Sequence, residues 1–549
     1  MARTLLAKSE PKSSLTIKRT VMSIAADNNT KEFGKVRSFL WPIHFSELKK
    51  FIPMLAIFFF VGFNYSILRI TKDALVVTAP GSGAEALPFL KVWAILPMAF
   101  LFTFIFTRVS NRLSREKVFY VMMSIFIVFF SLFALVLYPC RDILHPHDFA
   151  DKVQSHLPLG LKGLIAIFRN WTYSAFYVMA EMWSTIIMTV LAWGFANDVT
   201  SVKDARRFYG VLGIAINISG ICAGNVVTSL SQNTFNPNLF IGTDAWGQSI
   251  FFINCIIVIG SIVCVGCFRY MHKIGFGYNS ETYKHHHGET KVKMGLRKNF
   301  AYLAKSKYLV CIAVIVVMYN IAINLVEVVW KDQMKQLCPN PSEFNAYMGQ
   351  VLTAGGIVAT IVSIFILGAV IRNFSWKASA LISPIIMITT GVGFFSFILF
   401  KDTSFGNIAT WFGVTPLAVG VFFGSMQNCL ARASKYTFFD ATKEIAFIPL
   451  SKESKLKGKA AIDGVGSRLG KSGGSVIHQG LLMFSGTVAL STPYVAVLLF
   501  GVIAAWMLAV KALGKQFNAL VGQHETLSVT DEEKQTQGVV ATPAVETTS

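Results

Sequence analysis

The stretch LKGLIAIFRNWTYSAFYVMAEMWSTIIMTVLAWGFAN, residues 161–197, decides the class of this chain. Its only charged residues are Lys162, Arg169 and Glu181, and it is longer than the roughly 20 apolar residues that cross a bilayer. A carboxylate at such depth costs roughly 2.5–3.5 kcal/mol, and membrane proteins tolerate it where it faces a partner, a water-filled cavity or a substrate. The stretch therefore predicts a polytopic membrane protein with a polar pathway, which indicates transport.

The overall composition favours the same class. Of the 549 residues, 53% are hydrophobic and 14% are charged, whereas an average soluble domain has about 25% charged residues. The formal net charge is +21, but its Lys and Arg lie in loops, where they set topology and meet anionic lipid heads. We therefore expect a lipid bilayer around the chain and no binding of nucleic acid.

Apolar runs of spanning length recur along the chain and predict an all-α membrane protein with about twelve transmembrane helices. The expected spans are 51–69, 90–107, 118–138, 163–196, 208–230, 249–268, 308–330, 348–370, 378–400, 408–430, 460–488 and 490–510. The string GSRLGKSGG interrupts the eleventh span. Glycine and charge are tolerated within a span where the backbone lines a cavity.

A basic central loop divides these spans into two six-helix halves. The expected parts are an N-terminal segment at 1–50, a first half at 51–268, the loop at 269–307, a second half at 308–513, and a tail at 514–549 for which we expect disorder. The loops assigned to one side carry 25 Lys and Arg against 7 on the other, which places both termini in the cytoplasm. We interpret His285–His287 in the central loop as part of a solvated segment rather than a metal site.

The two halves share a short internal match. NYSILRITKD (64–73) ends the first span and NLVEVVWKD (324–332) ends the seventh, and each places an Asn about two turns before a Lys-Asp pair. The match suggests halves related as parallel repeats, an arrangement typical of alternating-access carriers.

Four charged residues within or at the ends of spans are the main candidates for a substrate site: Lys91, Glu181, Glu327 and Lys471. Each half contributes one cation and one carboxylate. Lysines bind phosphate oxygens as point charges. The carboxylates can pair with them when the site is empty, contact ribose or an exocyclic amine, or carry a proton. Static ion pairs that lock helices together are the alternative interpretation.

Six further polar residues are added as candidates: Lys72, Arg169, Asn197, Asn324, Lys331 and Lys459. Lys72 and Lys331, with Asp73, stand at the outer ends of the first and seventh spans. Snorkelling to the interface explains them, and a gating or substrate role is the alternative. Arg169 is a buried cation whose partner is Glu181 or a group on another helix.

No enzyme motif stands in a suitable context. The string GKSGG at 470–474 is not a P-loop, because that pattern requires Gly where Val465 stands. Its backbone amides and Lys471 can still approach an anion, as in a nest. His478 and Asp463 are interpreted as polar residues that face a cavity, with proton transfer as the alternative. We expect no cofactor.

Several longer strings carry a family resemblance: FLWPIHFSELKKFIPM, TAPGSGAEALPFLKVW, AEMW, AWGFAND, INLVEVVWK, FFDATKEIAFIPL, and KLKGKAAID followed by GKSGG. They resemble the nucleotide transporter family, the ATP/ADP translocases of plastids and of intracellular bacteria such as chlamydiae and rickettsiae. The resemblance implies a major-facilitator-like arrangement and exchange of nucleotides, most often external ATP for internal ADP plus phosphate. The family's functional charges fall on Lys91, Glu181, Glu327 and Lys471.

The chain also departs from the family pattern. It reads LRITKD where energy-parasitic members read LRDTKD, so Ile70 replaces an acid near the expected outer mouth. From the resemblance we expect a secondary transporter that exchanges ATP for ADP by alternating access. Because of the change at Ile70 we keep as alternatives a broad-specificity ribonucleotide exchanger and a proton-coupled importer of nucleotides or NAD. A membrane enzyme that uses a nucleotide donor is a remote alternative. We expect a monomer in a bacterial inner membrane, with the plastid inner envelope as the alternative.

Overall fold

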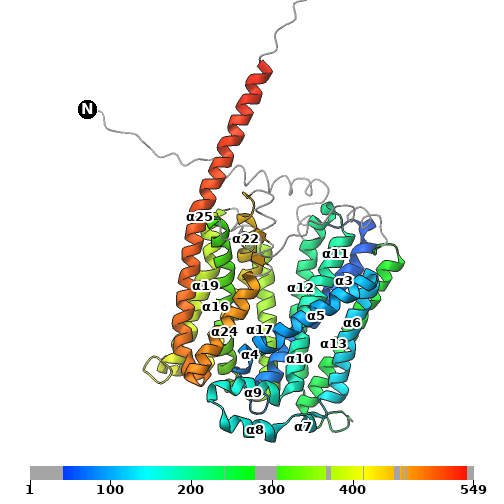
Figure 1. Ribbon diagram of the computed structural model, residues 1–549, viewed down its shortest axis with the longest axis vertical. Helices are drawn as coiled ribbons and strands as arrows, with labels where there is room; N and C mark the ends of the chain where they lie inside the picture. The colour runs from blue at the N-terminus through cyan, green and yellow to red at the C-terminus, as the bar shows by residue number, and fades with distance from the viewer. Residues whose placement is uncertain are drawn as a thin grey trace, which may run out of the picture.

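The computed structural model describes residues 41–239, 241–278, 306–366, 373–411, 413–450, 458–459, 462–463 and 466–540 (Figure 1). These residues form helices and no strand. Ten of the helices among them are long and apolar enough to cross a membrane. The expected all-α membrane fold is therefore confirmed. The three histidines of the central loop lie outside the described residues, and the loop boundaries at 269 and 307 stay a prediction.

The first half consists of long helices joined by shorter ones. The long helices are α3 (Leu48–Val77), α5 (Leu96–Arg112), α6 (Arg115–Leu132), α10 (Trp171–Met182), α12 (Val202–Ser231) and α13 (Ala245–Lys273). The short elements are η1 (Phe45–Glu47), α4 (Ala86–Phe89), η2 (Leu90–Ile95), η3 (Phe133–Leu137), α7 (Arg141–Leu144), α8 (His147–His156), η4 (Leu159–Leu161), α9 (Lys162–Arg169), η5 (Trp183–Ala192) and α11 (Trp193–Val199).

The second half is built in the same way. Its long helices are α16 (Lys307–Leu337), α17 (Pro341–Ile361), α19 (Trp376–Leu399), α21 (Pro416–Ser434), α24 (Ser467–Ser485) and α25 (Val488–Val540). Its short elements are η6 (Val362–Ile366), α20 (Asn407–Trp411), η7 (Lys435–Phe439) and α22 (Asp440–Ala446). The two groups stand side by side, with α8 and α9 across one end (Figure 1).

Two of the twelve expected spans, 408–430 and 460–488, are helices that are more polar than the ten apolar ones. They correspond to α21 and α24. Arg468, Lys471, His478 and Gln479 lie on α24, so this helix has an apolar surface too narrow for lipid on all sides. Both helices nevertheless pack within the second half, α21 on α19 and α24 on α16.

Three expected boundaries differ from the structure. The first span continues to Val77, because no helix breaker stands between residues 69 and 77. The fourth span does not begin at 163, since the backbone leaves helical geometry at Asn170, between α9 and α10. α25 continues past residue 514 to Val540, because Gly522 is the only Gly or Pro between 515 and 537.

Helices α12 and α17 form the largest contact between the halves. Glycines permit the close approach: a methyl group added at Gly224 would lie 2.6 Å from the Gly349 carbonyl oxygen, and one added at Gly349 would lie 2.8 Å from that of Gly224. Small residues at helix crossings let backbones pack closely in membranes. Thr228 Oγ1 adds a hydrogen bond of 3.2 Å to the Ala346 carbonyl oxygen.

Candidate substrate site between the two halves

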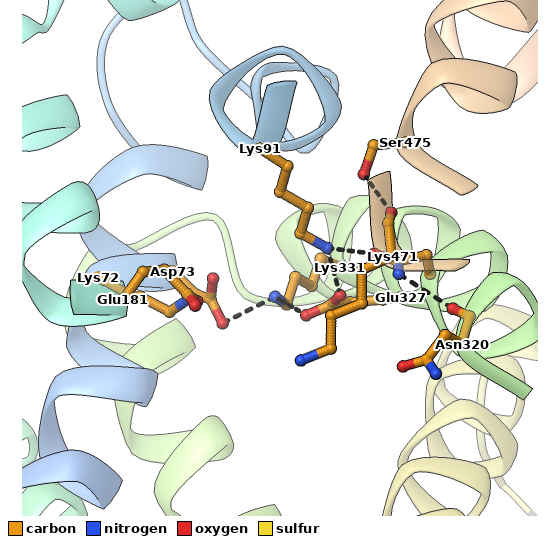
Figure 2. Close-up of polar contacts among 10 residues, drawn as sticks. Lys72, Asp73, Lys91, Glu181, Asn320, Glu327, Lys331, Lys471 and Ser475 are labelled. Atoms are coloured by element: carbon orange, nitrogen blue, oxygen red, sulfur yellow. Dashed lines mark hydrogen bonds and ion pairs between the residues drawn. The ribbon is translucent and has the colours of Figure 1, made fainter. Parts of the chain in front are cut away.

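A chain of alternating charges links the two halves (Figure 2). Asp73 on α3 contacts Lys331 on α16, with 2.7 Å between Oδ2 and Nζ. Lys331 donates to Glu327 Oε1 at 2.6 Å, one turn back on the same helix. Glu327 Oε2 then accepts from Lys91 of η2 at 2.7 Å. Asp73 and Lys91 of the first half therefore both contact α16, Asp73 through Lys331 and Lys91 through Glu327.

Asn324 extends this chain by one contact. Its Oδ1 accepts from Lys91 Nζ at 2.6 Å, and its Nδ2 donates to the Asn320 carbonyl oxygen at 3.0 Å. Lys91 therefore touches two side chains of α16 that lie three residues apart, which fixes its amine over one face of that helix.

A second ion pair lies wholly within the first half. Lys72 on α3 donates to Glu181 on α10, and its amine lies 4.0 Å from the ring centroid of Tyr177. Tyr177 and Lys72 are buried, whereas the Glu181 side chain is 36% exposed. A carboxylate with that exposure at mid-helix faces the space between helices rather than a packed core. The sequence placed the Glu181 carboxylate deep in the membrane, and the structure shows that Lys72 compensates its charge there.

Lys471 differs from the other lysines of the site. Its side chain is exposed, and within the described part of the chain its amine has neither a hydrogen bond nor an ion pair. Figure 2 shows the amine reaching toward Glu327 and Lys331 without a contact. Lys471 is therefore a cation available to a ligand.

The backbone is π-helical at Lys91 and just after Glu181. The π-helix η2 begins one residue before Lys91, and η5 begins two residues after Glu181. Such wide turns are frequent at functional sites, because they shift side chains out of the regular α-helical register. The charged residues Lys91 and Glu181 thus both lie in or next to a π-helical segment.

Three candidates from the sequence do not join this network. Arg169 does not pair with Glu181, because the helix break at Asn170 turns it toward Asp151 on α8, with which it forms an ion pair. Asn197 is exposed and accepts a hydrogen bond of 2.6 Å from Tyr209 Oη. Lys459 pairs with Glu444 at 2.6 Å.

Some expectations for the remaining residues were wrong. Lys72, Asp73 and Lys331 do not snorkel to the interface, since they are 5%, 2% and 1% exposed and all lie in ion pairs. The GKSGG string forms no nest, because it lies inside α24, and Gly470 and Gly474 pack on α16 at Asn320 and Asn324. For Lys72, Asp73 and Lys331, the only feature of the sequence that pointed to a shared role was the Asn followed about two turns later by a Lys-Asp pair, which occurs in both halves.

His478 and Asp463 have different surroundings from the cavity that the sequence suggested. His478 on α24 is fully buried, and neither ring nitrogen has a partner among the described residues. Asp463 pairs with Lys443 on α22 at 2.8 Å, away from the central network.

Further contacts join the halves at the end that carries α8 and α9. Gln479 of α24 donates to the Pro88 carbonyl oxygen at 2.9 Å and accepts from Trp93 Nε1 at 3.3 Å. Lys335 of α16 donates to the Ser82 carbonyl oxygen. A methyl group added at Gly160 would lie 2.5 Å from the Leu482 carbonyl oxygen. This end of the interface is therefore closely packed.

A buried histidine lies at the same end, outside the membrane-spanning segments. His145 follows α7 and is 5% exposed, and its Nε2 lies 2.6 Å from Thr172 Oγ1. Burial, with a smaller contribution from the nearby His147, lowers the pKa of His145 to about 4.

Two groups of helices with a network of charges between them form a membrane protein of the major-facilitator-like fold class. The fold agrees with a solved bacterial homologue of the iron transporter ferroportin, which matches 86% of this chain and 99% of its own at a TM-score of 0.51 and 15% identity.

Comparison with known sequences defines the family. The family model for the TLC ATP/ADP transporter matches residues 26–517. ADP,ATP carrier protein 1 of Chlamydia muridarum is 45% identical over 493 residues, which cover 89% of this chain and 92% of the relative. The chloroplastic ADP,ATP carrier protein 2 of Arabidopsis thaliana is 40% identical, over 88% of this chain and 77% of the relative. The chain belongs to the TLC ATP/ADP transporter family.

Proposed function

We propose that the protein exchanges ATP for ADP across a membrane by alternating access. The observation that carries this proposal is the buried charge network, in which Lys91 and Lys331 join the two halves through carboxylates. Two relatives carry the name of ADP,ATP carriers. A nucleotide is a polyanion, and its phosphates are the ligand class that competes best with carboxylates for lysine.

The network also supplies a reason for obligatory exchange. When no substrate is bound, the pairs Asp73–Lys331 and Lys91–Glu327 hold the halves together at one end of the interface. Phosphate oxygens that bind Lys91 and Lys471 would release Glu327 and weaken this lock. A ligand drives a conformational change only through its differential affinity for the two states. Competition between the phosphates and Glu327 for Lys91 would give the nucleotide such a difference in affinity.

We further propose a topology and a subunit state. The basic segments 107–117, between α5 and α6, and 198–210, between α11 and α12, lie at the end opposite α8 and α9. By the positive-inside rule we therefore expect α8 and α9 outside and both termini in the cytoplasm. The packed end of the interface would then be the outer end. We also propose that the monomer is the transporting unit.

The test is uptake of α-labelled ATP into proteoliposomes that contain the purified protein. Vesicles preloaded with ADP are compared with empty vesicles, and unlabelled GTP, UTP, CTP and NAD are added as competitors. Uptake only with internal ADP, blocked by adenine nucleotides alone, would support ATP/ADP exchange. Uptake into empty vesicles under a proton gradient, or competition by every nucleotide, would overturn strict exchange in favour of the importer or the general exchanger.

A variant pair tests the site itself. Lys91→Ala removes a cation that contacts Asn324 and Glu327, and Lys459→Ala removes one that contacts Glu444 away from the network. We expect Lys91→Ala to lower uptake at least tenfold, while Lys459→Ala stays near the wild-type rate at equal amounts of inserted protein. Equal rates in both variants would contradict the assignment.

A further inference from the structure

Arg468 stands one turn from Lys471 on α24 and is a second cation without a partner. It is the second residue of α24, its side chain is exposed, and among the described residues that side chain has neither an ion pair nor a hydrogen bond. Two like charges one turn apart on a helix repel each other. A pair of cations without a carboxylate therefore needs another source of compensation.

The carboxylates that come before α24 in the sequence are already paired. Asp463 contacts Lys443 at 2.8 Å, and Glu444 of α22 contacts Lys459 at 2.6 Å. Glu327, toward which Lys471 points, is shared by two other lysines of the charge network (Figure 2). The described part of the chain thus supplies no acid to the two cations of α24, and both charges are left for a ligand.

Arg468 lies within the bundle and not at its rim. A methyl group added at Gly458 would lie 2.7 Å from Leu309, close to the start of α16, and one added at Gly470 would lie 2.9 Å from the Val317 carbonyl oxygen. The two segments therefore run side by side in the same direction. Val317 is ten residues beyond the first residue of α16, so it lies about 15 Å along that helix at 1.5 Å per residue. Arg468 is two residues before Gly470 and lies roughly 12 Å along the same axis.

The spacing of the polar residues on α24 gives the direction in which Arg468 points. Residues three, four, seven and eleven positions after it share its face of the helix, and these are Lys471, Ser472, Ser475 and Gln479. The exposed apolar side chains of α24 lie on a different face: Leu469, Val476, Ile477, Met483 and Phe484. Arg468 therefore belongs to the polar face that carries Lys471, and the apolar face is the one suited to lipid.

Burial changes along this polar face. Ser475 and Gln479 are 2% and 6% exposed, and Gln479 donates to the Pro88 carbonyl oxygen of the first half. Arg468 and Lys471, nearer the start of the helix, are exposed. The first half thus covers the polar face at the end that carries α8 and α9, and it leaves the part with the two cations accessible to a solute.

We propose that Arg468 binds the end of the nucleotide's phosphate chain, beside Lys471, and thereby selects nucleotides by their number of phosphates. The proposal rests on nucleotide exchange as the proposed function and adds a phosphate-binding residue to its site. A guanidinium group binds a phosphate through two parallel hydrogen bonds and keeps its charge in any environment. With Lys91 and Lys471 bound to the phosphates nearest the charge network, Arg468 is one turn further from that network and reaches the next phosphate.

The test is the binding of phosphates to the purified protein in detergent. Dissociation constants are obtained from the rise of the melting temperature with ligand concentration, and the probes are ATP, AMP and inorganic triphosphate. Arg468→Gln removes the charge, and Arg468→Lys keeps the charge without the planar fork. Arg112→Gln, which removes an exposed arginine at the end of α5, is the control.

We expect Arg468→Gln to raise the dissociation constants of ATP and triphosphate at least about tenfold, and that of AMP less than about threefold, because AMP has no further phosphate for Arg468. Arg468→Lys should fall between Arg468→Gln and the wild-type protein, and Arg112→Gln should bind like the wild type. Without ligand, the Arg468 variants should melt near the wild-type temperature, since the arginine has no contact to lose in the described structure.

Unchanged constants in Arg468→Gln would overturn the proposal, and so would equal losses for ATP and AMP, which would assign Arg468 to the nucleoside or to the fold. An equal loss in Arg112→Gln would also overturn it, because the effect would then be a long-range attraction of anions. Failure of wild-type vesicles to exchange ATP for ADP would instead overturn the proposed function. A selective loss of triphosphate binding in Arg468→Gln would still support the phosphate site in that case, so the two failures are distinguishable.

Discussion

Neutralising Asp73 is the most direct way to measure how strongly the two halves are held together. The Asp73 and Lys331 side chains are 3% and 2% exposed, and their charged atoms lie 2.7 Å apart. At an effective dielectric constant of about 20, two unit charges at that distance attract by roughly 6 kcal/mol before desolvation is subtracted. Removing one partner of a buried pair costs about 3–5 kcal/mol. Because Lys331 retains Glu327, we expect about 3 kcal/mol for Asp73→Asn.

This loss falls on the state in which the packed end is closed, so the empty carrier should change state more easily. About 3 kcal/mol corresponds to an increase of up to about 100-fold in the rate of that change. The assay is efflux of labelled ADP from proteoliposomes with and without external ATP. We expect Asp73→Asn to raise efflux without ATP toward the exchange rate.

The matched control is Asp332→Asn, which removes an acid of α16 whose contacts are hydrogen bonds from Gln333 and Gln336. It should leave the efflux without ATP unchanged. The double variant Asp73→Asn/Lys331→Met should cost less stability than the sum of the single variants, since no buried charge is left unpaired. Wild-type efflux in Asp73→Asn, with exchange intact, would refute this account of the lock.

Three further predictions follow from other contacts. Gly224→Val would place its added Cβ 2.6 Å from the Gly349 carbonyl oxygen, so it should lower the stability by about 1–3 kcal/mol. The melting temperature in detergent should fall accordingly. Gly213→Val is the control, because a side chain at this position of the same helix meets open space and should leave the melting temperature unchanged. Lys471→Ala should abolish uptake without lowering the melting temperature, because its exposed amine has no partner to lose in the described structure. His145 has a pKa lowered to about 4 from an ordinary value of 6.5, so the unfolded chain takes up its proton first and the melting temperature should fall between pH 6.5 and 4. His145→Gln should lose that part of the pH dependence.

Each of these expectations has a clear counter-result. Equal melting temperatures for Gly224→Val and Gly213→Val would show that α12 and α17 are not in close contact in the membrane protein. Normal uptake by Lys471→Ala would remove that lysine from the substrate site. An unchanged pH profile in His145→Gln would assign the titration to another group.

The amino-acid sequence predicted the helical membrane fold, because runs of about 20 apolar residues have few other stable forms. It also selected Lys91, Glu181, Glu327 and Lys471, since a charge within such a run needs a reason to be there. The structure then pairs Lys91 with Glu327, which the sequence had allowed as the state of an empty site.

The pairing of Glu181 could not be predicted from the sequence. Its partner is Lys72 rather than Lys471 or Arg169, and the choice depends on how α3 and α10 are rotated against each other, which no local pattern encodes. Lys72 was assigned to the interface because its apolar run stops near residue 69, whereas the helix itself continues to Val77. The end of an apolar run is thus a poor marker for the end of a helix whose last turns are buried in protein.

The two bridges on α16 have a consequence for how sharply the carrier changes state. Asp73–Lys331 and Lys91–Glu327 connect the same two bodies, so once one pair has formed, the partners of the other are held at a high effective concentration. Each pair then closes more readily in the presence of its neighbour. Arrangements in which only one of the two ion pairs is formed are therefore disfavoured. The two pairs form together and break together, so the interface changes state cooperatively.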